Sequence, residues 1–169
     1  MQPNITKSAM LNGLIMGIIF SLNFILSVSN NTTLIMLTNI ITIAILVVIY
    51  RTTVKFRDTE FGGFITYWIA FKYILYTFFF AALISSVVKF TYFQFINPAY
   101  LDTFMYDETM KMLVRMKYPI NETIEAQTRS MLKPASYTLL WVWVNVFIGS
   151  VVGIILAAFI KKEKSIFTE

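Results

Sequence analysis

The sequence has no cysteine and no histidine among its 169 residues, and it contains little charge. Without these two residue types the chain has no disulfide, no thiolate or imidazole ligand for zinc or haem, and no Cys or Ser–His nucleophile. Charged residues make up 14% of the chain, whereas a soluble domain has about a quarter. These absences disfavour most enzyme classes, and we expect a non-enzymatic protein without a cofactor or metal site.

Hydrophobic residues are abundant, at 57% of the chain, and they form long runs between short charged clusters. The charges gather at residues 51–60, 102–133 and 161–169. Because lipid tails cannot solvate a charge, this pattern predicts an integral membrane protein that has the lipid bilayer as its partner. The formal net charge of +5 indicates that basic residues orient the protein in the membrane and contact anionic headgroups. No segment combines dense Lys and Arg with aromatics in a polar context, so we expect no nucleic-acid partner.

The long apolar runs predict an all-α fold, an integral membrane four-helix bundle that forms one transmembrane domain over residues 1–169. The predicted spans are residues 9–28, 34–50, 64–96 and 135–160. The first run is longer than the core of a usual signal peptide, which favours a membrane span over a cleaved leader. The third run, roughly 50 Å long as a helix, exceeds the hydrocarbon thickness and must tilt, kink or protrude. We expect the charged residues 51–60 to end the second span.

Residues 97–134 join the third and fourth spans and predict an extracytoplasmic helical hairpin. Its first helix, residues 100–117, is amphipathic, and its Met-rich face is adaptable apolar surface that we expect on the membrane or over the outer end of the bundle. Asn121 is placed to cap a second helix that runs through Met131. Charges four residues apart predict one ion pair on each helix: Asp107 with Lys111, and Glu125 with Arg129.

Four spans place both termini on one side of the membrane, and the basic residues indicate which side this is. That side carries a dense group of them: Lys7, Arg51, Lys55, Arg57, Lys161, Lys162 and Lys164. The basic residues of the 97–134 loop are spread over a longer segment, although Arg129 and Lys133 lie close to the fourth span. Because Lys and Arg concentrate on the cytoplasmic side, we expect a bacterial inner (cytoplasmic) membrane protein with both termini in the cytoplasm.

Two stripes of small residues recur at every fourth position, one in the first span and one in the fourth. The stripes are Ala9, Gly13, Gly17 and Ser21, and Asn145, Gly149, Gly153 and Ala157. Small side chains let helix backbones approach closely inside a membrane. The simpler interpretation is packing within one chain, and the other is a face for a homodimer or a partner subunit. We predict that the first and fourth spans contact each other through these stripes.

Lys72 and Lys89 are the charges that lie well inside a predicted span. Lys72 lies about eight residues past the start of the third span, roughly 12 Å deep, with Trp68 and Tyr76 one turn away on either side. No predicted span contains an acidic residue that would pair with it. The simpler interpretation is a lysine that extends to the water interface. The functional one is contact with an anionic lipid headgroup, a phosphate or a partner's carboxylate, and we hypothesise that Lys72 lies towards the bundle interior.

Several segments resemble one known family: "NGLIMGIIFSL" in the first span, "FGGFITYWIAFKYILY" at the third, "FINPAYLD" at its end and "IGSVVGIILAAFIKK" in the fourth. The chain resembles a family of small four-span inner-membrane proteins from Bacteroidota that is catalogued as a domain of unknown function. The resemblance covers nearly the whole chain and implies four spans, and it assigns no catalytic residue.

The lack of catalytic groups favours a non-enzymatic membrane scaffold or accessory subunit. Its expected partner is another membrane protein, with a lipid-linked glycosyltransferase as one candidate, or a second copy of the chain in a homo-oligomer. The main alternative is a small transporter, channel or lipid-binding membrane protein, for which Lys72, Trp68 and Tyr76 would form the site. An enzyme that acts on lipid is the third interpretation.

Overall fold

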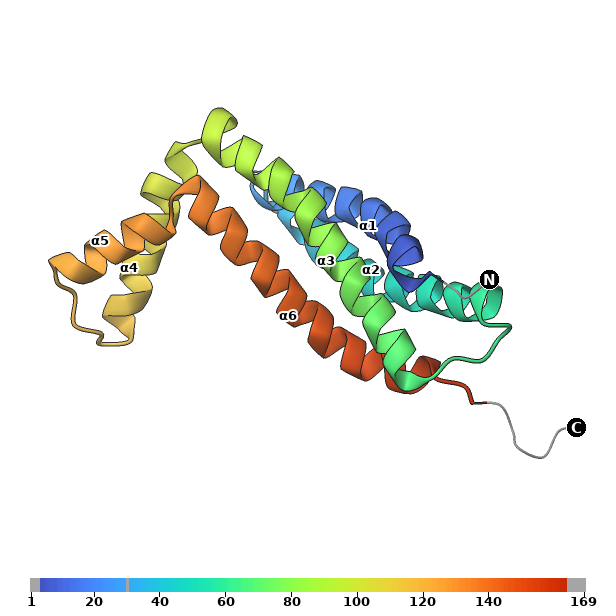
Figure 1. Ribbon diagram of the computed structural model, residues 1–169. Coiled ribbons are helices and arrows are strands. Elements are labelled where there is room, and N and C mark those ends of the chain that lie inside the picture. Colours follow the sequence, from blue (N-terminus) through green and yellow to red (C-terminus); the bar gives the residue numbers. More distant parts are fainter. Residues whose placement is uncertain (1–3, 30, 164–169) are drawn as a thin grey trace, which may run out of the picture. The chain divides into compact units, whose positions relative to one another are not determined.

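The computed structural model describes residues 4–29 and 31–163, and four of its helices are long and apolar enough to cross a membrane (Figure 1). These are α1 (Ile5–Ser27), α2 (Thr32–Glu60), α3 (Tyr67–Thr91), which a π-helical segment extends to Ile96, and α6 (Pro134–Ile160). Two shorter helices, α4 (Tyr106–Arg115) and α5 (Glu122–Met131), separate α3 from α6 in the sequence. The described residues form no strand, so the all-α fold is confirmed, and the four long helices make this a multi-pass membrane protein.

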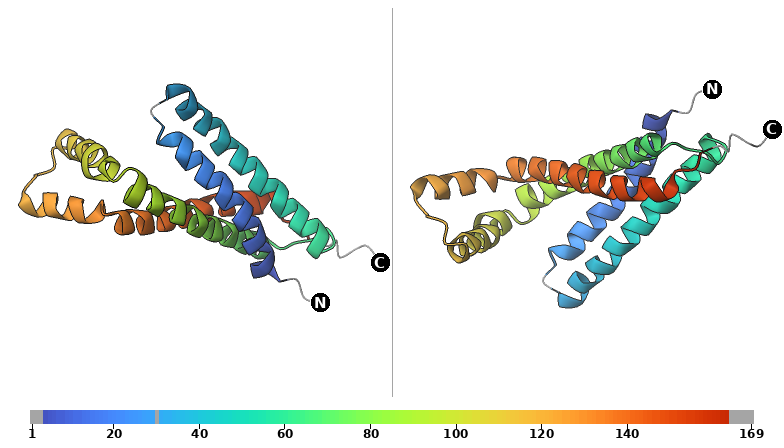
Figure 2. Two further views of the ribbon diagram at one scale, coloured as in Figure 1. Left: turned by 90° about the horizontal axis from the view of Figure 1, so that it is seen from above. Right: turned by 90° about the horizontal axis from the view of Figure 1, so that it is seen from below.

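The chain packs as two compact units. The first takes in the residues up to Ser85 and those from Val144 onward, and it contains the α1–α2 hairpin with long parts of α3 and α6. The second runs from Ser86 to Trp143 and contains the remaining turns of α3 and α6 together with α4 and α5. In all views α1 and α2 lie side by side (Figure 2). Because α3 and α6 contribute to both units, the single transmembrane domain stays a prediction.

Polar caps and glycines set the ends of α1 and α2. The side chain of Asn4 accepts the N–H of Lys7 at the start of α1, and that of Asn31 accepts the N–H of Thr33 at the start of α2. Each cap satisfies a backbone donor that the first helical turn leaves free. Helix α2 ends before Gly62 and Gly63, whose φ angles of 62° and 90° a residue with a side chain rarely adopts.

The second helix does not end at the charged residues 51–60, whereas the end of the second membrane span there stays a prediction. Helix α2 continues through them to Glu60. Lys, Arg and Glu are good helix formers, and the backbone hydrogen bonds of a helix are as compatible with headgroups and water as with hydrocarbon. Hydropathy marks where an apolar run stops, whereas the helix itself runs on until the backbone is interrupted.

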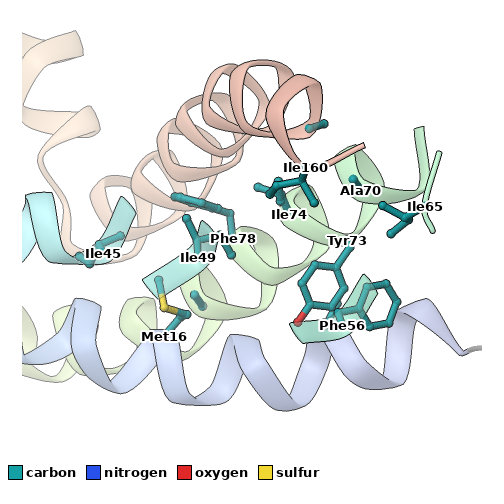
Figure 3. Close-up of a cluster of buried hydrophobic side chains, with 13 residues drawn as sticks. Met16, Ile45, Ile49, Phe56, Ile65, Ala70, Tyr73, Ile74, Phe78 and Ile160 are labelled. Atoms are coloured by element: carbon teal, nitrogen blue, oxygen red, sulfur yellow. The ribbon is translucent and has the colours of Figure 1, made fainter. Parts of the chain in front are cut away.

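The core of the first unit is a cluster of apolar side chains from α1, α2, α3 and α6 (Figure 3). Its fully buried members include Met16, Ile49, Ile74 and Ile160. Phe56 of α2 stacks on Tyr73 of α3 with ring centroids 4.1 Å apart. Since lipid tails are as apolar as these side chains, close packing between helices carries more of the stability here than hydrophobic transfer does.

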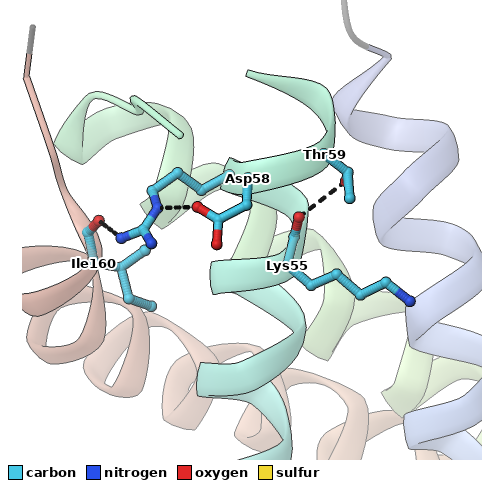
Figure 4. Close-up of polar contacts among 5 residues, drawn as sticks. Lys55, Asp58, Thr59 and Ile160 are labelled. Atoms are coloured by element: carbon cyan, nitrogen blue, oxygen red, sulfur yellow. Dashed lines mark hydrogen bonds and ion pairs between the residues drawn. The ribbon is translucent and has the colours of Figure 1, made fainter. Parts of the chain in front are cut away.

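Polar contacts at one end of the first unit join the end of α6 to α2 (Figure 4) and to the segment before α3. The Arg57 guanidinium donates to the carbonyl oxygen of Ile160 over 3.2 Å and pairs with Asp58 over 2.8 Å. Ile65 and Lys162 exchange two backbone hydrogen bonds of 2.9 and 3.0 Å. These bonds satisfy groups that the end of α6 would otherwise leave without partners.

The second unit contains two short helices, α4 and α5, in the segment for which a helical hairpin is predicted. A π-helical segment, Tyr100–Met105, precedes α4, and Asn121 caps α5 by accepting the N–H of Ile124, as predicted. Both predicted ion pairs are wrong. Lys111 pairs with Glu108 over 2.8 Å in place of Asp107, and this contact lowers the pKa of the Glu108 carboxyl. Arg129 does not pair with Glu125, because its guanidinium lies 4.0 Å from the ring centroid of Tyr106.

Candidate functional site

Lys72 lies on the exposed face of α3, so the hypothesis that it lies in the bundle interior is wrong. Trp68 and Tyr76 share this face, with 65% and 37% of their surfaces exposed. The opposite side of α3 is buried through Ile74, Phe78 and other core residues. The physical reason is helical periodicity, because positions 68, 72 and 76 recur about once per turn and share one face, which lies opposite the face of Ile74 and Phe78.

The rings of Trp68 and Tyr76 do not cover the Lys72 ammonium. Trp68 instead makes edge contacts with the rings of Tyr67 and Phe71, at centroid distances of 5.2 and 5.9 Å. Among the residues that the structure describes, Lys72 has neither a cation–π contact nor an ion pair. Its ammonium group is therefore available to a group from outside the chain.

The level of Lys72 along the bundle is set by its neighbour Tyr73. Tyr73 stacks on Phe56, which belongs to the charged part of α2. Helix α3 begins at Tyr67, so Lys72 is five residues into it, or about 7.5 Å at 1.5 Å per residue. A lysine side chain can extend over such a distance to the headgroups. Lys72 thus belongs with the charged residues at this end of the first unit rather than with the hydrocarbon core.

This charged end of the first unit is strongly basic. Among the residues that the structure describes, this end has three acidic side chains, Asp58, Glu60 and Glu163, and seven basic ones: Lys7, Arg51, Lys55, Arg57, Lys72, Lys161 and Lys162. Arg57 and Asp58 pair with each other. The other described end of the α1–α2 hairpin, residues 27–33, has no charged side chain. The basic end therefore carries a positive potential that favours anionic headgroups.

The two glycine stripes pack against α3 and not against each other, so the predicted contact between them is wrong. A β-carbon at Gly13 would lie 2.5 Å from Cβ of Phe80, and one at Gly17 would lie 2.6 Å from Cβ of Ile84. A β-carbon at Gly149 would lie 2.5 Å from Cβ of Phe78. The pattern of small residues does not reveal that both stripes pack against α3. Helix α3 therefore makes two close helix–helix contacts, one with α1 and one with α6.

Sequence reasoning missed a polar surface on the α1–α2 hairpin. Asn39 is exposed on α2, seven residues from the start of the helix, and its amide makes no hydrogen bond within the described part of the chain. Nearby, the Asn23 amide nitrogen donates to the Thr42 hydroxyl over 3.4 Å, and its oxygen has no partner. The available signal was the presence of Asn39 and Thr42 inside an otherwise apolar run.

A second missed feature lies in the other unit, where Lys89 lies over the ring of Trp141 at 4.7 Å from its centroid. Trp141 contacts Tyr137, which makes an edge contact with the buried Phe93. The second lysine of the third span thus lies against Trp141, which belongs to a row of contacting aromatic rings. The sequence signal was the matching position of the two residues. Lys89 lies seven residues before the end of one span and Trp141 lies seven residues after the start of the next, which predicts a similar level.

The described side chains at these places are lysines, amides, hydroxyls and aromatic rings, which suit binding and assembly. A family described as "Protein of unknown function (DUF4199)" matches residues 11–162. No curated protein matches the chain, and no solved structure does.

Proposed function

The chain belongs to the DUF4199 family of proteins of unknown function, since the family match covers nearly all of it, and we propose that it is a non-enzymatic scaffold or accessory subunit that assembles with another protein inside the membrane. The observation that carries this proposal is the exposed Asn39 amide on α2, beside the Asn23–Thr42 pair. The proposal includes a location, the bacterial inner membrane, with the basic end and both termini in the cytoplasm. The density of basic residues at that end supports it.

An amide in hydrocarbon needs a hydrogen-bond partner that lipid tails cannot supply. Asn39 lies about 10 Å from the start of α2, which is too deep for its short side chain to reach water. An unpaired amide costs several kcal/mol in an apolar medium. Asn side chains in membrane helices form hydrogen bonds across to neighbouring helices. A helix of another subunit, placed against this surface, would supply the partner that the exposed Asn39 amide lacks.

The exposed position of Lys72 favours this assembly role over the alternative of a transporter or channel. A transport site needs its polar groups towards an interior path, whereas Lys72, Trp68 and Tyr76 all lie on an outer face. A second copy of the chain and a lipid-linked glycosyltransferase are the two kinds of subunit that we would look for first.

Photo-crosslinking in native membranes tests the proposal. A crosslinking amino acid at Ile43, one turn from Asn39 and 66% exposed, is expected to give a protein adduct of discrete mass. The same group at Phe147 of α6, which is 70% exposed, provides the matched control and is expected to label mainly lipid. The mass of the adduct distinguishes a second copy from a different protein.

The variant Asn39→Leu should reduce the Ile43 adduct several-fold, because the leucine has no hydrogen bond to offer a partner helix. The proposal is overturned if Ile43 and Phe147 label lipid alone to the same extent, or if Asn39→Leu leaves the protein adduct unchanged.

A further inference from the structure

Helices α1 and α3 run parallel, and their contacts define a register that sequence reasoning did not supply. Gly13 lies against Thr77 and Phe80, and four residues later Gly17 lies against Ala81 and Ile84. The offset between the two helices is therefore about 65 residues at both places. Lys7 of α1 precedes Gly13 by six residues, and the same offset places it at the level of Lys72 of α3. A separate contact supports this level, because the Tyr73 hydroxyl of α3 faces Ser8 of α1.

Lys7 and Lys72 are both exposed at this level. Helices α1 and α3 contain no acidic residue, and neither lysine has an ion pair within residues 4–29 and 31–163. At the same end, Asp58 pairs with Arg57 and not with either lysine. Two adjacent helices thus present two lysine charges at one height, close to the hydrocarbon boundary.

The exposed side chains around Lys72 suit a lipid better than a soluble anion. Trp68 has 65% of its surface exposed one turn nearer the basic end, and Tyr76 lies one turn deeper. Trp and Tyr are enriched where headgroups meet acyl chains, because each has an apolar ring and a polar group. Below them Phe79 and Leu83 continue the same face of α3 and are also exposed. The face therefore offers a cation at the level of a phosphate and an apolar track at the level of an acyl chain.

We propose that Lys7 and Lys72 together bind the phosphate of an anionic phospholipid, with Trp68 and Tyr76 packed against its glycerol and upper acyl chain. The occupant is a lipid of the leaflet at the basic end, and charge complementarity selects it. The surface is separate from the Asn39 surface on α2, so this inference stands or falls independently of the assembly proposed above.

Native mass spectrometry of the full chain, released from nanodiscs that contain phosphatidylglycerol and phosphatidylcholine, tests the proposal. We expect retained phosphatidylglycerol in preference to phosphatidylcholine. Lys72→Gln and Lys7→Gln should each reduce its retention about five-fold, in line with the contribution of one lysine near an anionic surface. Lys72→Arg, which keeps the charge, should retain the lipid, and Lys55→Gln, at the same end on α2, is the matched control and should have little effect.

Three outcomes would overturn the proposal. The first is equal retention of the two lipids. The second is an equal loss for Lys55→Gln and Lys72→Gln, which would indicate a diffuse charge effect. The third is displacement of phosphatidylglycerol by millimolar inorganic phosphate, which would indicate a soluble anion as the occupant. If Lys72→Gln does not fold, Lys7→Gln and Lys72→Arg still decide between these results.

Discussion

Two glycines of α6 differ in how closely α3 approaches them, and this difference can be measured. A β-carbon at Gly149 would lie 2.5 Å from Cβ of Phe78, which is fixed to the backbone, whereas one at Gly153 would lie 3.0 Å from the ring of Phe71, which can turn. Gly149→Ala is therefore expected to lower the free energy of unfolding by about 1–3 kcal/mol through overpacking. Gly153→Ala should lower it clearly less. Unfolding of the purified protein in mixed detergent micelles measures both.

Gly153→Ala is the matched control because it makes the same chemical change on the same helix, one turn away. Equal stability losses for the two variants, or the larger loss at position 153, would show that α6 does not approach α3 as described.

Tyr73 is buried with a hydroxyl that makes no hydrogen bond of good geometry, although it faces the hydroxyls of Ser8, Thr52 and Thr77. A buried polar group without a partner keeps its desolvation cost. Tyr73→Phe removes the hydroxyl and keeps the ring stacked on Phe56, so it should raise the free energy of unfolding by up to about 1 kcal/mol.

Tyr73→Leu is the comparison for this residue, since it also removes the stacked ring. It should lower the free energy of unfolding by about 1 kcal/mol or more. A destabilisation by Tyr73→Phe as large as that by Tyr73→Leu would mean that the hydroxyl is hydrogen-bonded in the folded chain.

Among the structural elements, the hydrophobic spans could be predicted and the helix ends could not. The helices α1 and α6 begin within a few residues of the predicted spans, because their apolar runs match the hydrocarbon thickness. Helix α2 extends ten residues beyond its predicted span, to Glu60, because side-chain hydropathy does not report where backbone hydrogen bonding stops. The same limit applies to the level of Lys72, which depends on the contact between Tyr73 and the charged part of α2 and cannot be counted from the start of an apolar run.

The end of α6 depends on a contact from α2, and removing that contact should loosen it. Arg57 donates to the carbonyl of Ile160, next to the backbone pair of Ile65 and Lys162. Arg57→Leu should speed hydrogen–deuterium exchange at the amides of Ile65 and Lys162 by about ten-fold, as expected for the loss of one hydrogen bond from a charged group. Lys55→Leu, on the same helix, should leave the exchange unchanged. Slow exchange in both variants would show that the backbone pair holds without Arg57.

For the molecule as a whole, composition was enough to predict four spans. Each segment can cross the membrane or not according to its own content of charged and apolar residues, whatever the other segments do. Which helices touch was not predictable in the same way. Both glycine stripes were identified, yet each packs on α3, since a small residue shows that a helix comes close but not which helix it is. The exposure of polar side chains was the hardest property to predict. Whether Asn39 and Lys72 are exposed or packed is known only when the packed side of each helix is known.

The arrangement of the four spans is the claim on which the other conclusions depend, and the chain is well suited to test it because it has no native cysteine. Single variants Lys55→Cys, Met116→Cys and Lys162→Cys would be exposed to a membrane-impermeant maleimide in sealed, oriented vesicles. We predict that positions 55 and 162 react from one side and position 116 from the other. Reaction of positions 55 and 162 from opposite sides, or of all three from the same side, would contradict the four-span arrangement.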